Sequence, residues 1–152
     1  MRAMIAALVT AITLAAPQQV LAQQAEITRA REAFVQAYEA GNLDSLMALH
    51  LPDSTFAGTL QPFWLHGPEV RDLWNRYLGG TQRRLVRFRD VETRLYADNV
   101  SVETGYMEMY MDRPPSPELI ATFIRYSITR VLRNGDWLIA NMNVARLPDG
   151  RP

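Results

Sequence analysis

The stretch that decides the fold is Thr122–Arg146, which reads TFIRYSITRVLRNGDWLIANMNVAR. Two runs rich in β-branched and aromatic residues flank Asn134-Gly135, the pair best suited to a two-residue type I′ hairpin turn. In a regular hairpin, cross-strand partners lie on the same face of the sheet. We therefore predict that one face carries Tyr126, Ile128, Arg130, Leu132, Trp137, Ile139, Asn141 and Asn143. The opposite face then carries Ser127, Thr129, Val131, Leu138, Ala140, Met142 and Val144.

The first of these faces is apolar beside the turn and polar farther along the strands. That pattern is typical of a wall that closes a core at one end and lines a small-molecule pocket at the other. We predict ligand contacts from Tyr126, Arg130, Asn141 and Asn143. Arg130 keeps its proton, so it needs an anionic partner or water. Its donors, with the two amides, favour an apolar ligand that carries a carboxylate, and an internal pair with Glu108 is the alternative.

The chain before the hairpin begins with segments in which apolar residues recur at helical spacing. The first predicted helix runs from Glu26 to a stop at Gly41, where a left-handed conformation suits glycine. Asn42 caps a short second helix that reaches Leu49. A third helix starts at Gly67-Pro68, a capping position followed by proline at the first helical residue, and ends at Gly79-Gly80.

Beyond the third helix the spacing of apolar residues changes from 3.6 to 2. Long strands are predicted over 84–96 and 100–111, and a short strand is predicted over 54–58, between the second and third helices. A change of phase near Arg89-Asp90 indicates a bulge that bends the sheet. The order of elements predicts an α+β fold, in which a curved antiparallel sheet wraps three N-terminal helices and encloses a cavity.

The composition excludes several classes of protein. The 152 residues are 48% hydrophobic and 21% charged, which suits one domain with one core. The formal net charge is zero, so the chain lacks the basic footprint of a nucleic-acid-binding protein. Cysteine is absent, which excludes disulfides and thiolate chemistry. The two histidines, His50 and His66, form no recognisable metal spacing, and we expect no cofactor.

The first 22 residues have the pattern of a signal peptide. Arg2 precedes an uncharged run, Ala3 to Ala16, and Val20-Leu21-Ala22 offers the small residues that signal peptidase accepts. The run is shorter than the about 20 residues of a membrane-spanning helix. We predict cleavage after Ala22, a mature domain over 23–152 that is free of the membrane, and a periplasmic or secreted location. An uncleaved anchor helix is the alternative.

Three segments carry a resemblance to a known superfamily: AYEAGNLDSLMALH (37–50), HGPEVRDLW (66–74) and TRVLRNGDWLIANMN (129–143). Over residues 26–147 the chain resembles the nuclear transport factor 2-like superfamily. Within it the chain is most similar to secreted members related to the SnoaL-like polyketide cyclases, the ketosteroid isomerases and the calcium/calmodulin-dependent kinase association domain. The resemblance implies a cone-shaped fold that hosts isomerases, dehydratases, hydrolases, cyclases and non-catalytic binders. Asn141 and Asn143 stand where the superfamily commonly has two histidines, so acid–base chemistry is lost there.

Two carboxylates are candidates for a general base. If the Arg130 face is concave, the neighbouring strand is expected to add Val102, Thr104, Tyr106, Glu108 and Tyr110 to it, and a carboxylate beside a pocket is what proton abstraction needs. Asp53 follows the second helix, where some superfamily members carry a pocket acid. Glu108 and Asp53 therefore support an alternative function as a cofactor-independent isomerase, dehydratase or cyclase. Their ordinary roles are an ion pair for Glu108 and a turn for Asp53.

The remaining predictions concern ligand contacts and assembly. Tyr106, Trp64 and Trp74 complete the predicted ligand-binding set. The face opposite the pocket is expected to be smooth and apolar, and we predict a homodimer through it, formed by Thr129, Val131, Ala140, Met142 and Val144. The alternating Met107, Met109 and Met111 are expected on that same face, as interface or core packing, with a copper(I) site as the minor alternative. The predicted function is small-molecule binding, and the sequence does not identify the ligand.

Overall fold

The structure is a computed structural model that describes residues 2–59, 61–80, 83–113 and 116–148, with the side chains of 2–17, 113 and 116–117 left undescribed. The elements are α1 (Arg2–Glu39), α2 (Leu43–Ala48), β1 (His50–Ala57), β2 (Leu65–His66), α3 (Pro68–Leu78), β3 (Arg84–Ala97), β4 (Val100–Arg113), β5 (Ser116–Arg133) and β6 (Asp136–Arg146). The sheet order is β2-β1-β6-β5-β4-β3. Strands β3 to β6 are antiparallel neighbours, as predicted, and β1 runs parallel to β6.

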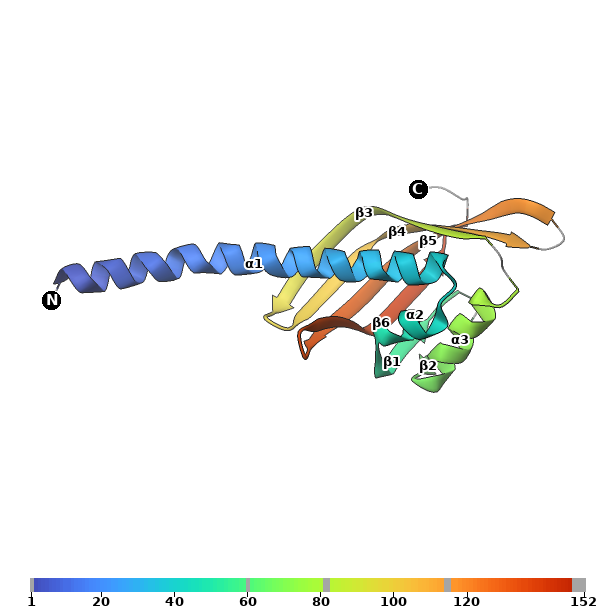
Figure 1. The fold of residues 1–152 in the computed structure, drawn as a ribbon, viewed down its shortest axis with the longest axis horizontal. Coiled ribbons are helices and arrows are strands. Elements are labelled where there is room, and N and C mark those ends of the chain that lie inside the picture. Colours follow the sequence, from blue (N-terminus) through green and yellow to red (C-terminus); the bar gives the residue numbers. More distant parts are fainter. Residues whose placement is uncertain (1, 60, 81–82, 114–115, 149–152) are drawn as a thin grey trace.

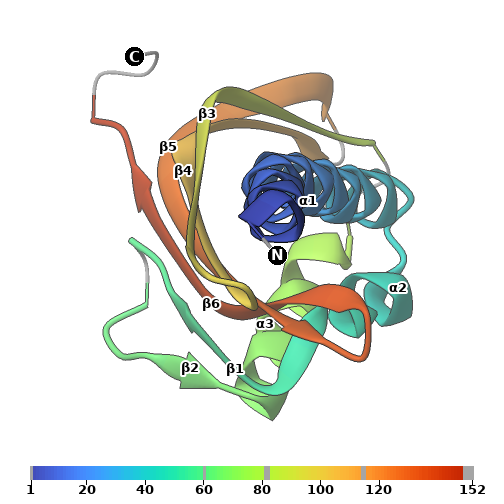
Figure 2. The same ribbon diagram turned by 90° about the vertical axis from the view of Figure 1, so that its left-hand side faces the viewer.

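The sheet curls around the helices and forms an open cone (Figures 1 and 2). The predicted α+β architecture is therefore confirmed. The short strand predicted over 54–58 is longer than expected, because β1 begins at His50. This places His50, the first histidine of the chain, in the sheet.

Local sequence signals explain where the helices begin. The Asn42 side chain accepts a hydrogen bond from the backbone N–H of Ser45 at 3.0 Å and caps α2 as predicted. Gly67, at φ +46°, precedes Pro68 at the start of α3. The Glu69 carboxylate then accepts a hydrogen bond from the backbone N–H of His66 at 2.9 Å. Helix α3 packs its apolar stripe into the cone, and α1 does the same with Ile27, Phe34, Ala37 and Tyr38.

A bulge in β6 changes the register that the hairpin turn predicts. Next to the turn, Leu132 faces Trp137 and Arg130 faces Ile139, as predicted. Farther on, Thr129 faces Asn141, so Ala140 is an extra residue in β6. Because side chains alternate along a strand, one extra residue exchanges the two faces of everything beyond it.

The predicted placement of the last half of β6 is therefore wrong. Met142 and Val144 turn into the cone, where Met142 is only 1% exposed. Asn141 and Asn143 turn to the convex face, beside Thr129 and Ser127. The bulge predicted near Arg89-Asp90 in β3 is confirmed, because Arg89 faces Tyr106 while Glu92 faces Thr104.

The predicted orientation of β4 is wrong as well. Its register places Ser101 opposite Arg130, Glu103 opposite Ile128 and Met107 opposite Ile124. The concave face therefore carries Ser101, Glu103, Gly105, Met107 and Met109, and the convex face carries Val102, Thr104, Tyr106, Glu108 and Tyr110. Met107 and Met109 are buried in the core, so they are not part of a convex interface. The sequence pattern fixed the period of β4 but left its phase open, and core burial of the methionines decided it.

Helix α1 extends well beyond the sheet (Figure 1). In the part of the chain with described side chains, its first fully buried residue is Ile27. Gln23, the first residue of the predicted mature domain, donates a side-chain hydrogen bond to the Asp98 carbonyl oxygen at 2.7 Å. Within the described residues, no helix has the length and apolar character needed to cross a membrane. Cleavage after Ala22 stays a prediction.

Candidate functional site

The concave side of the sheet encloses a cavity of about 160 Å³ beneath α3 and the β1–β2 connection. Its walls are apolar and aromatic, and they are formed by Phe56, Trp74, Met109, Ile124, Met142 and Val144. Polar atoms gather on the remaining lining residues, which include Thr59, Gln61, Tyr77, Thr122 and Arg146. An apolar cavity with a few polar groups is the usual form of a small-molecule site.

Trp74, one of the predicted ligand-contact residues, lines this cavity. Helix α3 directs it inward, where it is 2% exposed. Its ring meets Phe34 and Phe56 edge-on, with centroids 5.7 and 6.1 Å away. On another side the His50 ring lies 6.3 Å from it. Trp74 therefore stands between the apolar cavity and the polar part of the interior.

Arg146 supplies a positive charge to the cavity lining. It is the last residue of β6, and its backbone N–H donates to the Thr59 hydroxyl at 2.7 Å, which ties the strand end to the β1–β2 connection. Its side chain is exposed, and it has no ion-pair partner among the described residues. The cavity therefore combines an apolar body with one available guanidinium.

A second group of polar side chains lies inside the cone, and we call it the Glu103 cluster: Glu103, Arg31, Tyr126 and Arg130. The Glu103 carboxylate is 0% exposed and accepts a hydrogen bond from Arg31 at 2.7 Å and one from the Tyr126 hydroxyl at 3.1 Å. The Arg130 guanidinium, 1% exposed, lies 3.5 Å from the same carboxylate. Burial, and then the Glu103 charge, raise the pKa of Tyr126, so its hydroxyl remains a donor.

The Glu103 cluster shows which group is the ion-pair partner of Arg130, which the sequence left open. Its partner is an internal carboxylate, as in the alternative interpretation, but that carboxylate is Glu103 and not Glu108. Arg130 and Tyr126 point to the concave side as predicted, and Tyr126 is 4% exposed. Neither residue lines the 160 Å³ cavity.

His50 is a buried, uncharged histidine that lies between the predicted second helix and the strand predicted over 54–58. It begins β1, beside Ile139 of the parallel strand β6, and it is 5% exposed. Burial, and then the charge of Arg130, lower the pKa of His50 to about 4, so its imidazole is neutral at pH 7. His50 and Glu103 are among the polar site residues that sequence reasoning missed, together with Arg31 and Arg146. Met107 and Met109 lie on the same face of β4 as Glu103, because residues two or four apart in a strand share a face. These two apolar side chains were the sequence signal that could have placed Glu103 in the interior.

The two predicted catalytic acids lie away from the cavity. Glu108 is on the convex face, where its carboxylate accepts a hydrogen bond from Tyr110 at 3.0 Å and lies 3.3 Å from Arg89. The hydrogen bond from Tyr110, and then the charge of Arg89, hold the pKa of Glu108 below its usual range. Asp53 is exposed on β1. The described residues that line the cavity include neither a carboxylate nor an imidazole.

The other predicted ligand contacts also lie outside the cavity lining. The Asn141 amide donates to the Thr55 hydroxyl at 2.7 Å on the convex face. Asn143 is exposed, Tyr106 is half-buried on that same face, and Trp64 is 50% exposed in the β1–β2 connection. Of the predicted ligand-binding set, only Trp74 lines the concave cavity.

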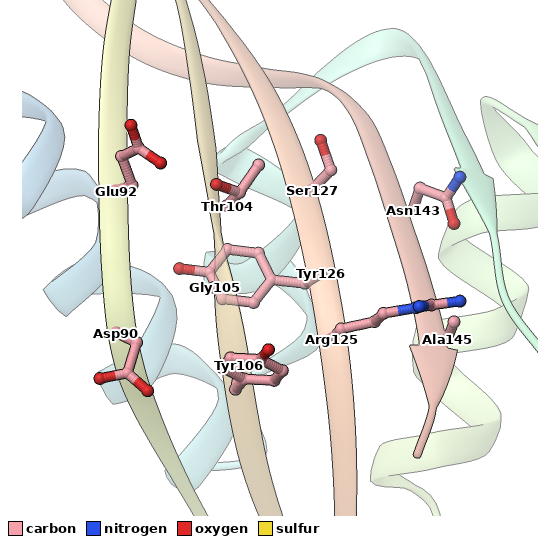
Figure 3. Close-up of a pocket in the computed structure, with 10 residues that line it drawn as sticks. All are labelled: Asp90, Glu92, Thr104, Gly105, Tyr106, Arg125, Tyr126, Ser127, Asn143 and Ala145. Carbon is pink, nitrogen blue, oxygen red and sulfur yellow. The ribbon is translucent and has the colours of Figure 1, made fainter. Parts of the chain in front are cut away.

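The convex face carries an open hollow of about 520 Å³ (Figure 3). Its residues come from β3 to β6, and cross-strand pairing places Glu92, Thr104, Ser127 and Asn143 in one row. The face is therefore more polar than the predicted apolar interface. Because Met142 and Val144 are in the core, the predicted dimer patch is reduced to Thr129, Val131 and Ala140. In the described part of the chain, no three His, Asp or Glu side chains are grouped so as to hold a metal ion.

Comparisons with known proteins agree with this geometry. The profile of one family, the SnoaL-like domain, matches residues 27–144. A protein from Novosphingobium aromaticivorans, proposed to be a scytalone dehydratase, superposes with a TM-score of 0.76 at 13% identity, covering 86% of this chain and 88% of that one. A hexachlorocyclohexane dehydrochlorinase from Novosphingobium barchaimii gives 0.71 at 14% identity, with 86% and 90% covered.

A ketosteroid isomerase-like protein from Erwinia carotovora gives a TM-score of 0.68 at 13% identity, covering 81% of this chain and 95% of that one. No curated protein sequence matches this chain. At these identities the superpositions show the shared fold, whereas the family profile covers most of the sequence. The chain therefore belongs to the SnoaL-like domain family and adopts the nuclear transport factor 2-like cone fold.

Proposed function

We propose that this protein binds a small, mainly apolar molecule that carries a carboxylate, and that it does so in the concave cavity. The observation that carries the proposal is the pairing of apolar walls with one available guanidinium, that of Arg146. The ligand class is the one the sequence suggested, but the arginine is a different one. Arg130 already faces Glu103 inside the protein, whereas Arg146 lines the cavity and has no ion-pair partner among the described residues.

The size of the cavity limits the ligand. A dry, apolar cavity of roughly 150 Å³ holds a molecule the size of benzene, and this cavity measures about 160 Å³. Phe56 and Trp74 offer ring contacts, and Met109 and Met142 offer flexible thioethers that adapt to irregular shapes. A single ring or a short branched chain therefore fits the apolar part, with the carboxylate at Arg146.

Binding is favoured over catalysis because the described cavity lining supplies no general base. Glu108 and Asp53 lie outside the cavity, and Glu103 is occupied by Arg31 and Tyr126. The isomerase, dehydratase or cyclase alternative needs an acid–base group that faces the ligand. We therefore do not assign to this chain the dehydratase activity for which one structural neighbour is named.

The proposal is tested with benzoate and benzamide, which have nearly the same shape and differ in charge. Calorimetric titration of the wild-type protein should show tighter binding of benzoate. An Arg146→Gln variant should lose about 1 kcal/mol of that preference, or about five-fold in Kd, because the guanidinium is exposed. Arg133→Gln, at the exposed hairpin turn, is the matched control and should keep the preference. Equal affinities for the two probes in the wild-type protein would contradict the assignment.

A second variant tests the location of the apolar part. Met142→Glu is unsuitable because it places a charge in the core, so we choose Val144→Phe, which fills the cavity with an apolar ring. This variant should fold and should lose binding of both probes. Retained benzoate binding by Val144→Phe would place the ligand elsewhere.

A further inference from the structure

Three polar side chains that make no hydrogen bond to any described residue lie in one row across the concave face. Ser101 pairs with Arg130 between β4 and β5, Arg130 pairs with Ile139 between β5 and β6, and Ile139 pairs with His50 of β1. Ser101, Arg130 and His50 are each at least nine-tenths buried. Within the described residues, the Ser101 hydroxyl, both terminal nitrogens of Arg130 and both ring nitrogens of His50 make no hydrogen bond.

The absence of partners is unusual for groups of this kind. Buried polar side-chain atoms nearly always have a hydrogen-bond partner, because leaving them bare costs free energy. The cost is greatest for a charged group, and Arg130 is charged. The Arg130 Nη1 atom lies 3.5 Å from the Glu103 carboxylate, which exceeds the roughly 2.7–2.9 Å of a charge-assisted hydrogen bond.

The charges of the Glu103 cluster do not balance. Glu103 is the buried carboxylate of the cluster, and it already receives Arg31 at 2.7 Å. Two guanidinium groups, those of Arg31 and Arg130, therefore share one carboxylate, while His50 is neutral. Arg31 is 18% exposed and reaches solvent, but Arg130 does not. The excess positive charge thus belongs to Arg130, at the centre of the row.

We propose that Ser101, Arg130 and His50 form a binding site for a small monovalent anion, of the size of chloride or formate. The guanidinium donates two hydrogen bonds to the anion, the hydroxyl donates one and the neutral imidazole donates one. Arg130 shares the single Glu103 carboxylate with Arg31, so its positive charge is only partly compensated. A site that combines this charge with hydrogen-bond donors favours an anion over a cation or a water molecule. Trp74 stands between this site and the apolar cavity, so the anion site is separate from the proposed ligand site.

The direct test is a crystal structure of the protein refolded and crystallised in sodium bromide. Bromide replaces chloride in such sites and is identified by its anomalous scattering. The expected result is an anomalous peak in contact with the Arg130 guanidinium and the Ser101 hydroxyl. Water density without an anomalous signal at that position would overturn the proposal.

The test in solution compares thermal unfolding in sodium gluconate and sodium chloride at one ionic strength. An anion that binds only the native state raises the melting temperature as its concentration rises, and gluconate is too large for a buried site. Ser101→Ala should weaken the apparent chloride affinity about five-fold through the lost hydrogen bond. Ser127→Ala, on the convex face, should leave it unchanged.

Arg130→Met should abolish the chloride dependence. If Arg130→Met does not fold, Ser101→Ala with its Ser127→Ala control decides the matter alone. A melting temperature that is indifferent to the exchange of gluconate for chloride, or a chloride effect of the same size in Ser101→Ala, refutes the anion site.

Discussion

Replacing Glu103 with glutamine should be one of the most destabilising conservative changes in this protein. The side chain keeps its shape but loses its charge, so Arg31 and Arg130 both lose their counter-ion. Arg31 is 18% exposed and can turn to solvent, whereas Arg130 is 1% exposed and cannot. Removing one partner of a buried ion pair costs about 3–5 kcal/mol. We expect Glu103→Gln to fall in that range, mainly because of Arg130.

The opposite change should be much milder, and this asymmetry is the sharper test. In Arg130→Met, Glu103 still faces Arg31 at 2.7 Å and still accepts the Tyr126 hydroxyl at 3.1 Å. The buried carboxylate therefore stays compensated, and a linear apolar side chain replaces the guanidinium stem. We expect a loss of about 1–2 kcal/mol, in the range of a lost hydrogen bond to a charged group.

Denaturant unfolding of the single variants and of the double variant measures these values. The double variant should be more stable than the sum of the single losses predicts, because Glu103→Gln has little to strand once Arg130 is gone. Glu108→Gln is the matched control on the same strand, since its partner Arg89 is half-exposed, and it should be far less destabilising than Glu103→Gln. An Arg130→Met variant as unstable as Glu103→Gln would refute the charge balance that we assign to the cluster.

Three further results are expected. In halide-free buffer, the free energy of unfolding should fall as the pH drops from about 6.5 to 4, because His50 is protonated in the unfolded chain but stays neutral in the folded protein. With a folded pKa of about 4, the loss approaches about 3 kcal/mol. The His50→Leu variant should lack this pH dependence. The chain contains no cysteine, so single introduced cysteines can report the register of β6. Asn143→Cys should react with a thiol reagent in the native protein, whereas Val144→Cys should be protected. The reverse result would refute the Ala140 bulge. A homodimer through the convex face stays a prediction, and sedimentation should show that Val131→Glu with Thr129→Glu dissociates it; a wild-type monomer at micromolar concentration would exclude it.

The sequence by itself determined the helix boundaries at Gly41, Asn42 and Gly67-Pro68, the four long strands and the architecture, but neither β2 nor the first residues of β1. Caps such as Asn42 and Gly67-Pro68 act through neighbouring backbone groups, and the Asn134-Gly135 turn sets the pairing of the residues beside it. Those are local effects, and local effects are readable from a single chain. The resemblance of three segments to the superfamily predicted the cone-shaped arrangement of these elements, and the family profile that matches residues 27–144 agrees with that prediction.

The tertiary structure alone decided which side chains meet inside the cone. One extra residue, Ala140, exchanged the faces of the last half of β6 and moved Asn141 and Asn143 outward. The phase of β4 then replaced Glu108 with Glu103 as the partner of Arg130. A strand pattern of period 2 has two equivalent phases, and only packing against the helices and neighbouring strands distinguishes them. For that physical reason the sequence predicted a polar interior around Arg130, but only the tertiary structure showed that Glu103, and not Glu108, is its partner.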